Sequence, residues 1–424
     1  MAYYSIFPEK DTTLYSHPDR KEMNSGGDEI LELLKERGST DNILYPSRIL
    51  MKFKNEDITT AFDLINPPGT MTVTHELNGS RGYSFLLPTQ YTASLNLTSA
   101  EPTNLTSVQN INIYALSQSW DEGTGRYSNL PASSDGANWI YNTGDITGTK
   151  WPTSSFGGAQ ATGSINSNLI TKGGGTWYVN AGGDAAYTGF EYSQQFLAGD
   201  SLDTNIDITQ LVNKWRFNIG GALKEDSTAI AVGYNQLPYI VENNGIIIKL
   251  PETVETNVSH SLGNLQYFSL DTHTIHPPKL TFKWDDSITH TSQSALNPKI
   301  KISGSLAVSL YRNKEEYNQN DVASFRIDVR DKYPTRTFST TSNNLGVGYF
   351  TTRSLYSIRD AHTEQEIVPF DIGSTKLSSD AEGMFCKIYM KGLQPERYYR
   401  LLFKDTNDEG TTVYDNDYYF KVVR

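Results

Sequence analysis

The sequence predicts an all-β protein folded as β-sandwiches, and three observations support this prediction. The composition favours sheets and turns, with 26 Tyr, 17 Phe, 33 Gly and 17 Pro but only 20% charged residues. Short runs in which apolar and polar residues alternate recur along the chain and are separated by turn-forming residues. The 424 residues exceed what one hydrophobic core usually serves, roughly 250–300 residues, so two or three domains are expected.

The first domain is expected over residues 1–290, as a jelly-roll-like sandwich. Its strands are predicted where the alternation is clearest, as at residues 47–53, 93–97 and 111–116. From residue 119 to residue 186 the sequence becomes rich in Gly around four tryptophans, which predicts long loops at one end of the sandwich.

Apolar residues at helical spacing predict two helices in this domain, over residues 28–37 and residues 207–217. In the second, Asp207 or Thr209 is the expected N-cap, and Leu211, Val212 and Trp215 fall on one face. The second helix is the stronger prediction because it has both a capping residue and an apolar face.

A second sandwich, immunoglobulin-like, is expected over residues 291–424. A polar stretch at residues 285–298 predicts a linker before it. Beyond the linker the alternation resumes, and strands are predicted at residues 300–302, 305–310, 323–329, 398–404 and 418–423.

Charge and cysteine content exclude some classes of partner. The 36 basic and 48 acidic residues give a net charge of −12, which opposes binding to a phosphate backbone, so no nucleic acid is expected. No apolar run approaches the roughly 20 residues that span a bilayer, and the opening residues do not resemble a signal peptide, so no membrane partner is expected. The single cysteine, Cys386, is expected to be a buried small hydrophobe in a protein made in a reducing cytoplasm.

The first 290 residues resemble the DNRLRE-type β-sandwich, a jelly roll related to carbohydrate-binding modules. The matching segments occur in the family's order, at residues 11–16, 47–53, 93–98, 119–125, 207–215 and 268–282. The sequence departs from the family at residues 28–37 and in the long Gly- and Trp-rich region. Residues 392–401 resemble the turn into the penultimate strand of a fibronectin-type or immunoglobulin-like module, where a Tyr braces the corner.

The opening of the chain and the segment Trp-Asp-Glu-Gly-Thr-Gly-Arg-Tyr at residues 120–127 are similar to structural proteins of cyanobacterial and related contractile-tailed bacteriophages. This resemblance implies a non-enzymatic virion protein, made in the host cytoplasm, that is an adaptor or decoration of the tail, neck or baseplate. It implies other phage structural proteins as partners, and a homo-oligomer. The alternative is a host-surface glycan-binding adhesin, such as a tail fibre or receptor-binding component.

Two groups of polar residues are candidate metal ligands. Asp121 and Glu122, next to a glycine turn, offer oxygens that a structural Ca²⁺ could use, but the loop is too short to form a metal site alone. The preferred interpretation is a turn capped by Asp121, and no cofactor is expected. His273 and His276 with Asp271 would ligate a metal only if the chain bends, because residues three apart in a strand point to opposite faces.

Four aromatic residues of the Gly-rich region are the remaining candidates, namely Trp139, Trp151, Trp177 and Tyr178. On exposed loops they could stack against sugar rings. Alternatively, they anchor the loops or fill a subunit interface, where Trp and Tyr are favoured. Because no nucleophile elbow, phosphate-binding loop or His-Glu-X-X-His motif occurs, no catalytic residue is expected.

Overall fold

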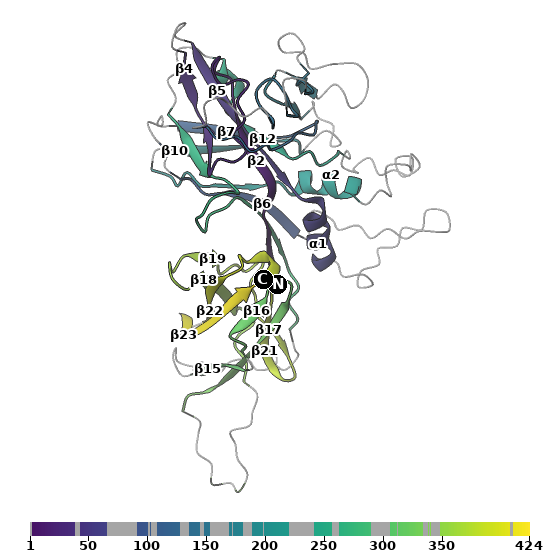
Figure 1. The fold of residues 1–424 in the computed structure, drawn as a ribbon. Coiled ribbons are helices and arrows are strands. Elements are labelled where there is room, and N and C mark those ends of the chain that lie inside the picture. The colour runs from purple at the N-terminus through teal and green to yellow at the C-terminus, as the bar shows by residue number, and fades with distance from the viewer. Residues whose placement is uncertain are drawn as a thin grey trace, which may run out of the picture. The chain divides into compact units, whose positions relative to one another are not determined.

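The computed structural model divides the chain into two compact units (Figure 1). Unit 1 comprises Met1–Ser5, Thr89–Tyr91 and Phe282–Arg424, and unit 2 comprises Ile6–Pro88 and Thr92–Thr281. The C-terminal unit thus begins near the predicted linker but also takes in two short segments from earlier in the chain. The structure describes residues 2–38, 43–65, 91–100, 102, 108–127, 135–144, 148–152, 169–171, 173–180, 189–197, 199–219, 241–256, 263–289, 306–311, 313–333, 338, 340, 348–407 and 410–424.

Unit 2 is built around an antiparallel sheet with the strand order β10-β7-β12-β5-β2. Its strands are β2 (Pro8–Tyr15), β5 (Leu44–Phe53), β7 (Val108–Ala115), β10 (Glu191–Leu197) and β12 (Ile246–Lys249). All four residues of β12 are buried, as a central strand covered on both faces requires. Ile247 pairs with Leu50 on one side and Tyr114 on the other, so the strands predicted at residues 47–53 and 111–116 lie on either side of β12.

A four-stranded sheet has the order β1-β14-β6-β11. It consists of β1 (Ala2–Ile6), β6 (Tyr91–Leu97), β11 (Thr204–Asp207) and β14 (Lys279–Trp284). The predicted strand at residues 93–97 is part of β6. In β6, the buried residues alternate with more exposed ones, as the sequence pattern predicted.

Of the two predicted helices, one is correct and one is wrong. The helix α2 (Thr209–Ile219) covers the second prediction, with Leu211, Val212 and Trp215 all buried, and Asp207 Oδ1 accepts the N–H of Thr209 at 2.9 Å. Residues 28–37 instead form β3 (Ile30–Leu33) and β4 (Lys35–Arg37). Helix α1 (Asn55–Ile65) also lies in this unit, with Ile58, Ala61 and Phe62 buried.

Tertiary pairing explains the wrong helix. Strand β3 pairs with β13 (Leu265–Phe268), which is more than 200 residues away in sequence, and β4 pairs with β5. In β3 the second and fourth residues, Leu31 and Leu33, are buried. The same leucines fit a helical spacing over so short a segment, so periodicity alone could not decide between the two structures.

The described parts of the Gly-rich region form mostly turns, as predicted, with one short hairpin. Strands β8 (Leu169–Thr171) and β9 (Thr176–Tyr178) pair with each other. The turn between them includes Gly173, Gly174 and Gly175, all with positive φ. Glycine adopts this conformation without the steric cost that other residues incur.

Unit 1 contains two further sheets. One has the order β15-β17-β21-β20, formed by β15 (Leu306–Tyr311), β17 (Val322–Asp331), β20 (Ser378–Asp380) and β21 (Gly383–Tyr389). The other has the order β16-β23-β22-β18-β19, formed by β16 (Glu316–Asn318), β18 (Leu355–Asp360), β19 (Glu366–Val368), β22 (Arg397–Asn407) and β23 (Gly410–Val423). Strand β16 runs parallel to β23, and the other neighbouring strands of these two sheets are antiparallel.

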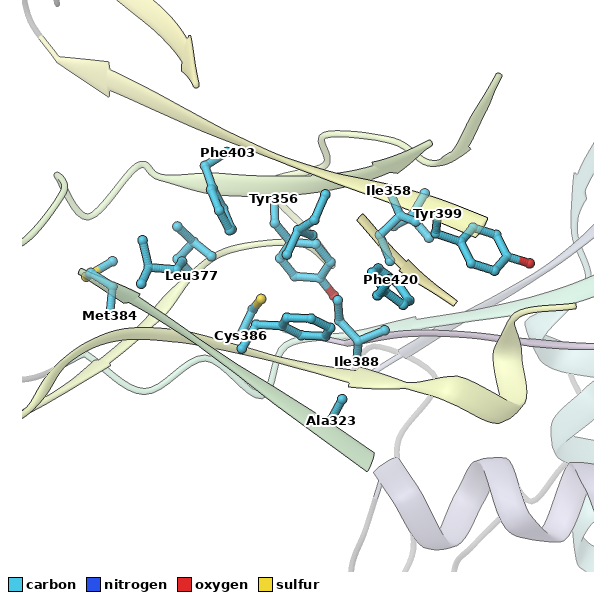
Figure 2. Packing of buried hydrophobic residues seen from close by; sticks show 14 of the residues in the cluster. Ala323, Tyr356, Ile358, Leu377, Met384, Cys386, Ile388, Tyr399, Phe403 and Phe420 are labelled. Carbon is cyan, nitrogen blue, oxygen red and sulfur yellow. The ribbon is translucent and has the colours of Figure 1, made fainter. Parts of the chain in front are cut away.

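The core of unit 1 is formed by side chains from both of these sheets, as Figure 2 shows. Alternate residues of β17 are buried, which matches the alternation predicted at residues 323–329. Cys386 is a free, buried cysteine among these apolar side chains, so the prediction of a buried small hydrophobe is confirmed. At the corner before β22, the Tyr399 hydroxyl donates a hydrogen bond of 2.8 Å to the carbonyl of Gln394.

The remaining predicted strands of unit 1 at residues 398–404 and 418–423 lie within β22 and β23, and residues 306–310 lie within β15. The predicted strand at residues 300–302 lies outside the described residues, as does most of the predicted linker. The all-β prediction is confirmed at the level of the class, since strands predominate among the described elements.

Candidate functional site

The most elaborate polar arrangement in unit 2 is a buried ion cluster formed by Arg48, Lys249 and Glu255. Strand β5 supplies Arg48, β12 supplies Lys249, and the short helix α4 (Glu252–Glu255) supplies Glu255. Arg48 Nε and Nη2 donate to the two carboxylate oxygens of Glu255 at 3.0 and 2.9 Å, and Lys249 Nζ lies 3.0 Å from Glu255 Oε2. The three side chains are at most 7% exposed, so this is an interior site.

The ion cluster also holds the glycine turn between β8 and β9. Arg48 Nη1 donates to the carbonyl oxygens of Gly173 and Gly174 at 2.7 and 3.1 Å. The Arg48 guanidinium lies 4.5 Å from the centre of the Trp139 ring and 5.0 Å from that of Trp177. One side chain thus connects a central strand, a helical turn and an aromatic loop through charge-assisted and cation–π contacts.

The electrostatics of the ion cluster depend on Glu255. Burial alone would raise the pKa of this carboxyl group, but the positive charges of Arg48 and Lys249, and their hydrogen bonds, lower it below its ordinary value. Burial lowers the pKa of Lys249, and Glu255 opposes that effect. The cluster is a satisfied network with no side chain directed to solvent, so its chemistry is structural.

Two of the four aromatic candidates, Trp139 and Trp177, lie against this cluster. Trp151 and Trp177 are buried, at 2% and 3% exposure, and belong to a hydrophobic cluster of unit 2. Trp151 Nε1 donates to the carbonyl of Asn138 at 2.8 Å. Trp139 and Tyr178 are partly buried, and the Tyr178 ring packs against Phe190 with 5.2 Å between centroids. These positions agree with loop anchoring, and only Trp139 and Tyr178 keep an exposed part that a ligand could touch.

A second polar centre, the Asn24 junction, fixes the loop that contains Asp121 and Glu122. The buried Asn24 amide donates to the carbonyls of Glu122 and Ala137 at 2.6 and 2.9 Å, and its oxygen accepts the N–H groups of Gly26 and Gly125 at 3.1 and 2.9 Å. A Cβ added at Gly26, Gly123, Gly125 or Gly136 would lie within 2.5 Å of an atom of Asn24 or Glu122. The glycines are therefore needed for close packing around one amide.

Of the two residues considered as possible Ca²⁺ ligands, Glu122 has its side chain engaged within this junction. Glu122 Oε1 accepts the N–H of Asp11 at 2.9 Å, and Trp120 is buried as predicted, with Nε1 donating to the Asn244 carbonyl. Within the described ranges, no three or more His, Cys, Asp or Glu side chains gather closely enough to hold a metal ion. His273 is exposed, and its Nε2 lies 3.6 Å from Glu29 Oε1. His276 stacks on the Phe268 ring, so the structure does not bring the two histidines together as ligands of one metal ion.

Three desolvated carboxyl groups lie near this junction, and the sequence pointed to only one of them, Glu122. Burial raises the pKa of Asp11 well above its usual range and that of Glu122 less strongly. Burial and the nearby Glu32 carboxylate raise the pKa of Asp28 to about 6. Asp28 accepts the backbone N–H of Tyr127 at 2.9 Å, and Asp11 accepts that of Leu270 at 2.7 Å. No local motif distinguishes Asp11 and Asp28 from exposed carboxylates.

No protein-family model matches the chain, and no curated protein is significantly similar to it. Among the described residues, no helix combines the length and the apolar character required to cross a bilayer. The function is therefore inferred from the side chains that the structure leaves accessible.

The accessible apolar side chains concentrate in unit 1. Tyr311, Val322, Tyr398, Val413 and Tyr419 are between 41% and 56% exposed. They lie on β15, β17, β22 and β23, where outward positions alternate with core positions. Sequence reasoning named the aromatic residues of the other unit as candidates, because the alternating pattern does not reveal which outward tyrosines remain uncovered.

Proposed function

We propose that the protein is a non-enzymatic structural component of a tailed-phage virion, an adaptor or decoration of the tail, neck or baseplate. In this proposal it forms a homo-oligomer and binds other virion proteins through protein–protein interfaces. The observation that carries the proposal is the set of exposed Tyr and Val side chains on the strands of unit 1. Tyr is enriched at protein interfaces because it offers a large, stiff contact area with one polar group.

The arrangement of strands supports the domain identities implied by the resemblances. In unit 1, the order β15-β17-β21-β20 in one sheet and β23-β22-β18 in the other fits an immunoglobulin-like sandwich. The Tyr399 hydrogen bond at the start of β22 fits the tyrosine corner of such domains. In unit 2, the five-stranded path through β12 fits the jelly-roll-like DNRLRE sandwich.

The polar centres of unit 2 support a structural role. The ion cluster and the Asn24 junction both connect loops to strands through groups whose hydrogen-bonding capacity is used inside the unit. A loop held by such interior contacts keeps one conformation, which suits a surface that must fit a neighbouring protein.

Cryo-electron microscopy of intact particles from the source tests the proposal directly. We expect density for both units repeated around the tail or neck axis, with Tyr398 and Tyr419 near a neighbouring chain. Substituting Tyr398 and Tyr419 by Ser should reduce the copy number in particles without unfolding the protein. Absence of the chain from purified particles would overturn the proposal.

A host-surface glycan-binding adhesin is the second candidate, and the partial exposure of Trp139 and Tyr178 favours it. A glycan array with the intact chain, followed by calorimetry, tests this function. Binding lost on Trp139→Ala and kept on Tyr398→Ala would support an adhesin, whereas the absence of binding to any glycan would leave Trp139 as a loop anchor.

A further inference from the structure

Residues 2–5, at the start of the sequence, pack against the core of unit 1. The residues that they contact lie far away in the sequence. Ala2, Tyr4 and Ser5 of β1 are at most 2% exposed. The Tyr4 ring meets the Tyr389 ring edge to face, with 6.2 Å between centroids, and Tyr3 packs against the hydrophobic core of unit 1. These contacts join residues 2–5 to residues near the end of β21.

Three residues of unit 1 lie beside this segment, namely Trp284 of the neighbouring strand β14, Tyr389 of β21 and Gly392. The Trp284 and Tyr389 rings pack together with 5.7 Å between centroids. A Cβ at Gly392 would lie 3.0 Å from the Ser5 nitrogen and 3.3 Å from Tyr4 Cδ2, so glycine allows β1 to approach closely. These three residues, called the groove below, meet the segment through the Tyr4–Tyr389 ring pair and the close approach at Gly392.

Strand β1 lies at the edge of its sheet, with β14 as its one neighbour in the strand order. Only Phe7 separates β1 from β2, which begins at Pro8. A proline favours an extended conformation in the residue before it, so Phe7 is a hinge suited to project β1 as an arm. Edge position and a short hinge are the features that favour exchange of an identical element between copies.

We propose that β1 is exchanged between copies of this chain, so that residues 2–5 of one copy occupy the groove of unit 1 in another. The contacts are the same in the closed and the exchanged forms, so local protein concentration and hinge geometry decide between them. The inference rests on the proposed function, because an ordered array of copies supplies that high local concentration. The proposed contact between copies in this array is β1 of one copy in the Trp284–Tyr389–Gly392 groove of another.

Disulfide trapping between two single-cysteine chains tests the exchange. Both chains carry Cys386→Ala; the donor carries Tyr4→Cys and the acceptor carries Gly392→Cys. The Cα of residue 4 lies 3.5 Å from a Cβ built at position 392, so cysteines at these two positions are near neighbours. The Cβ that Cys adds lies 3.0 Å from the Ser5 nitrogen, a contact that a shift of a few tenths of an ångström relieves. After co-expression and mild oxidation, we expect at least tenfold more donor–acceptor dimer than with a control donor that carries the exposed Tyr398→Cys. Dimer at the control level would overturn the exchange.

A second measurement does not depend on the cysteine variants. The acceptor is a full-length chain in which residues 2–5 are replaced by Gly and Ser, and the probe is a fluorescent peptide of residues 2–8. We expect saturable binding that weakens at least tenfold when the acceptor also carries Gly392→Leu. Absence of peptide binding would overturn the exchange, even if the chain is found in the particle. Absence of the chain from the particle would instead overturn the proposed function.

Discussion

The substitution Glu255→Gln isolates the contribution of the ion cluster to stability. It removes the one negative charge and leaves Arg48 and Lys249 buried next to a neutral amide. Breaking a buried ion pair by removing one partner typically costs about 3–5 kcal/mol, because the remaining charge is desolvated and unpaired. Since domains are stable by only about 5–15 kcal/mol, we expect the free energy of unfolding of unit 2 to fall by about a fifth or more.

Urea unfolding followed by tryptophan fluorescence measures this loss. All tryptophans except Trp284 fall within unit 2, so the signal reports mainly on that unit. Urea is chosen over guanidinium chloride because a salt would screen the charges under test. With an m-value of about 3 kcal/mol/M, the midpoint should shift by about 1 M or more. The matched control is Glu252→Gln, an exposed glutamate of the same helical turn, which should change stability by less than about 0.5 kcal/mol.

The pH dependence of the stability difference between the native chain and Glu255→Gln provides a second check. The pKa of Glu255 is lower in the folded chain than its ordinary value of 4.5, so its stabilisation is present above that value and is lost as the pH falls through the folded pKa. The gap between the native chain and Glu255→Gln should therefore be widest near neutral pH and narrow in acid. Equal effects of Glu255→Gln and Glu252→Gln at pH 7 would refute the reasoning.

Three further predictions concern other polar groups. The pKa of Asp28 is raised from 3.8 to about 6 in the folded chain, so this group stabilises the fold least above pH 6. The substitution Asp28→Asn should therefore flatten the pH–stability curve between about pH 4 and 6, by roughly 1 kcal/mol after allowance for solvent screening. Urea midpoints measured across that pH range check this. Asn24→Ala leaves four backbone groups without their buried partner and should cost about 2–4 kcal/mol in the same assay, whereas an unchanged midpoint would mean that water replaces the amide. Tyr399→Phe removes the hydroxyl bound to the Gln394 carbonyl and should lower the stability of unit 1 by about 1 kcal/mol in calorimetry, while Tyr398→Phe at its exposed neighbour should have almost no effect.

Much of the fold was predictable because burial repeats with the period of a strand. The alternation at residues 93–97 and 323–329 recurs in β6 and β17, where one face packs in a core. The capped segment from Thr209 was also recognisable as a helix because the cap and the apolar face agree. Residues 28–37 were not, because Leu31 and Leu33 fit either period and the partner strand β13 lies more than 200 residues away.

The candidate site was less predictable, since its residues meet only through long-range packing. Arg48, Lys249 and Glu255 come from two strands and a helical turn, and nothing in the neighbouring sequence marks them as buried charges. The tryptophans were noticed, and loop anchoring was one of the interpretations, but the sequence did not show that the glycines allow the loop to fold close against Trp139 and Trp177. Asn24 was missed for the same reason, because its partners Glu122 and Ala137 are about a hundred residues away.

The two units use their polar and apolar groups in opposite ways, and this contrast bears on assembly. Unit 2 places charges and amides in its interior, where Arg48 and Asn24 hold loops from distant parts of the chain. Unit 1 leaves Tyr398 and Tyr419 on the outside of strands whose inward neighbours fill the core. Ordering a loop costs conformational entropy, so interior anchoring reduces the further cost of fitting that loop to a partner. Exposed tyrosines gain free energy only when a neighbour covers them. In the proposed assembly, we therefore expect unit 1 to contribute most of the association energy and the fixed loops of unit 2 to contribute selectivity.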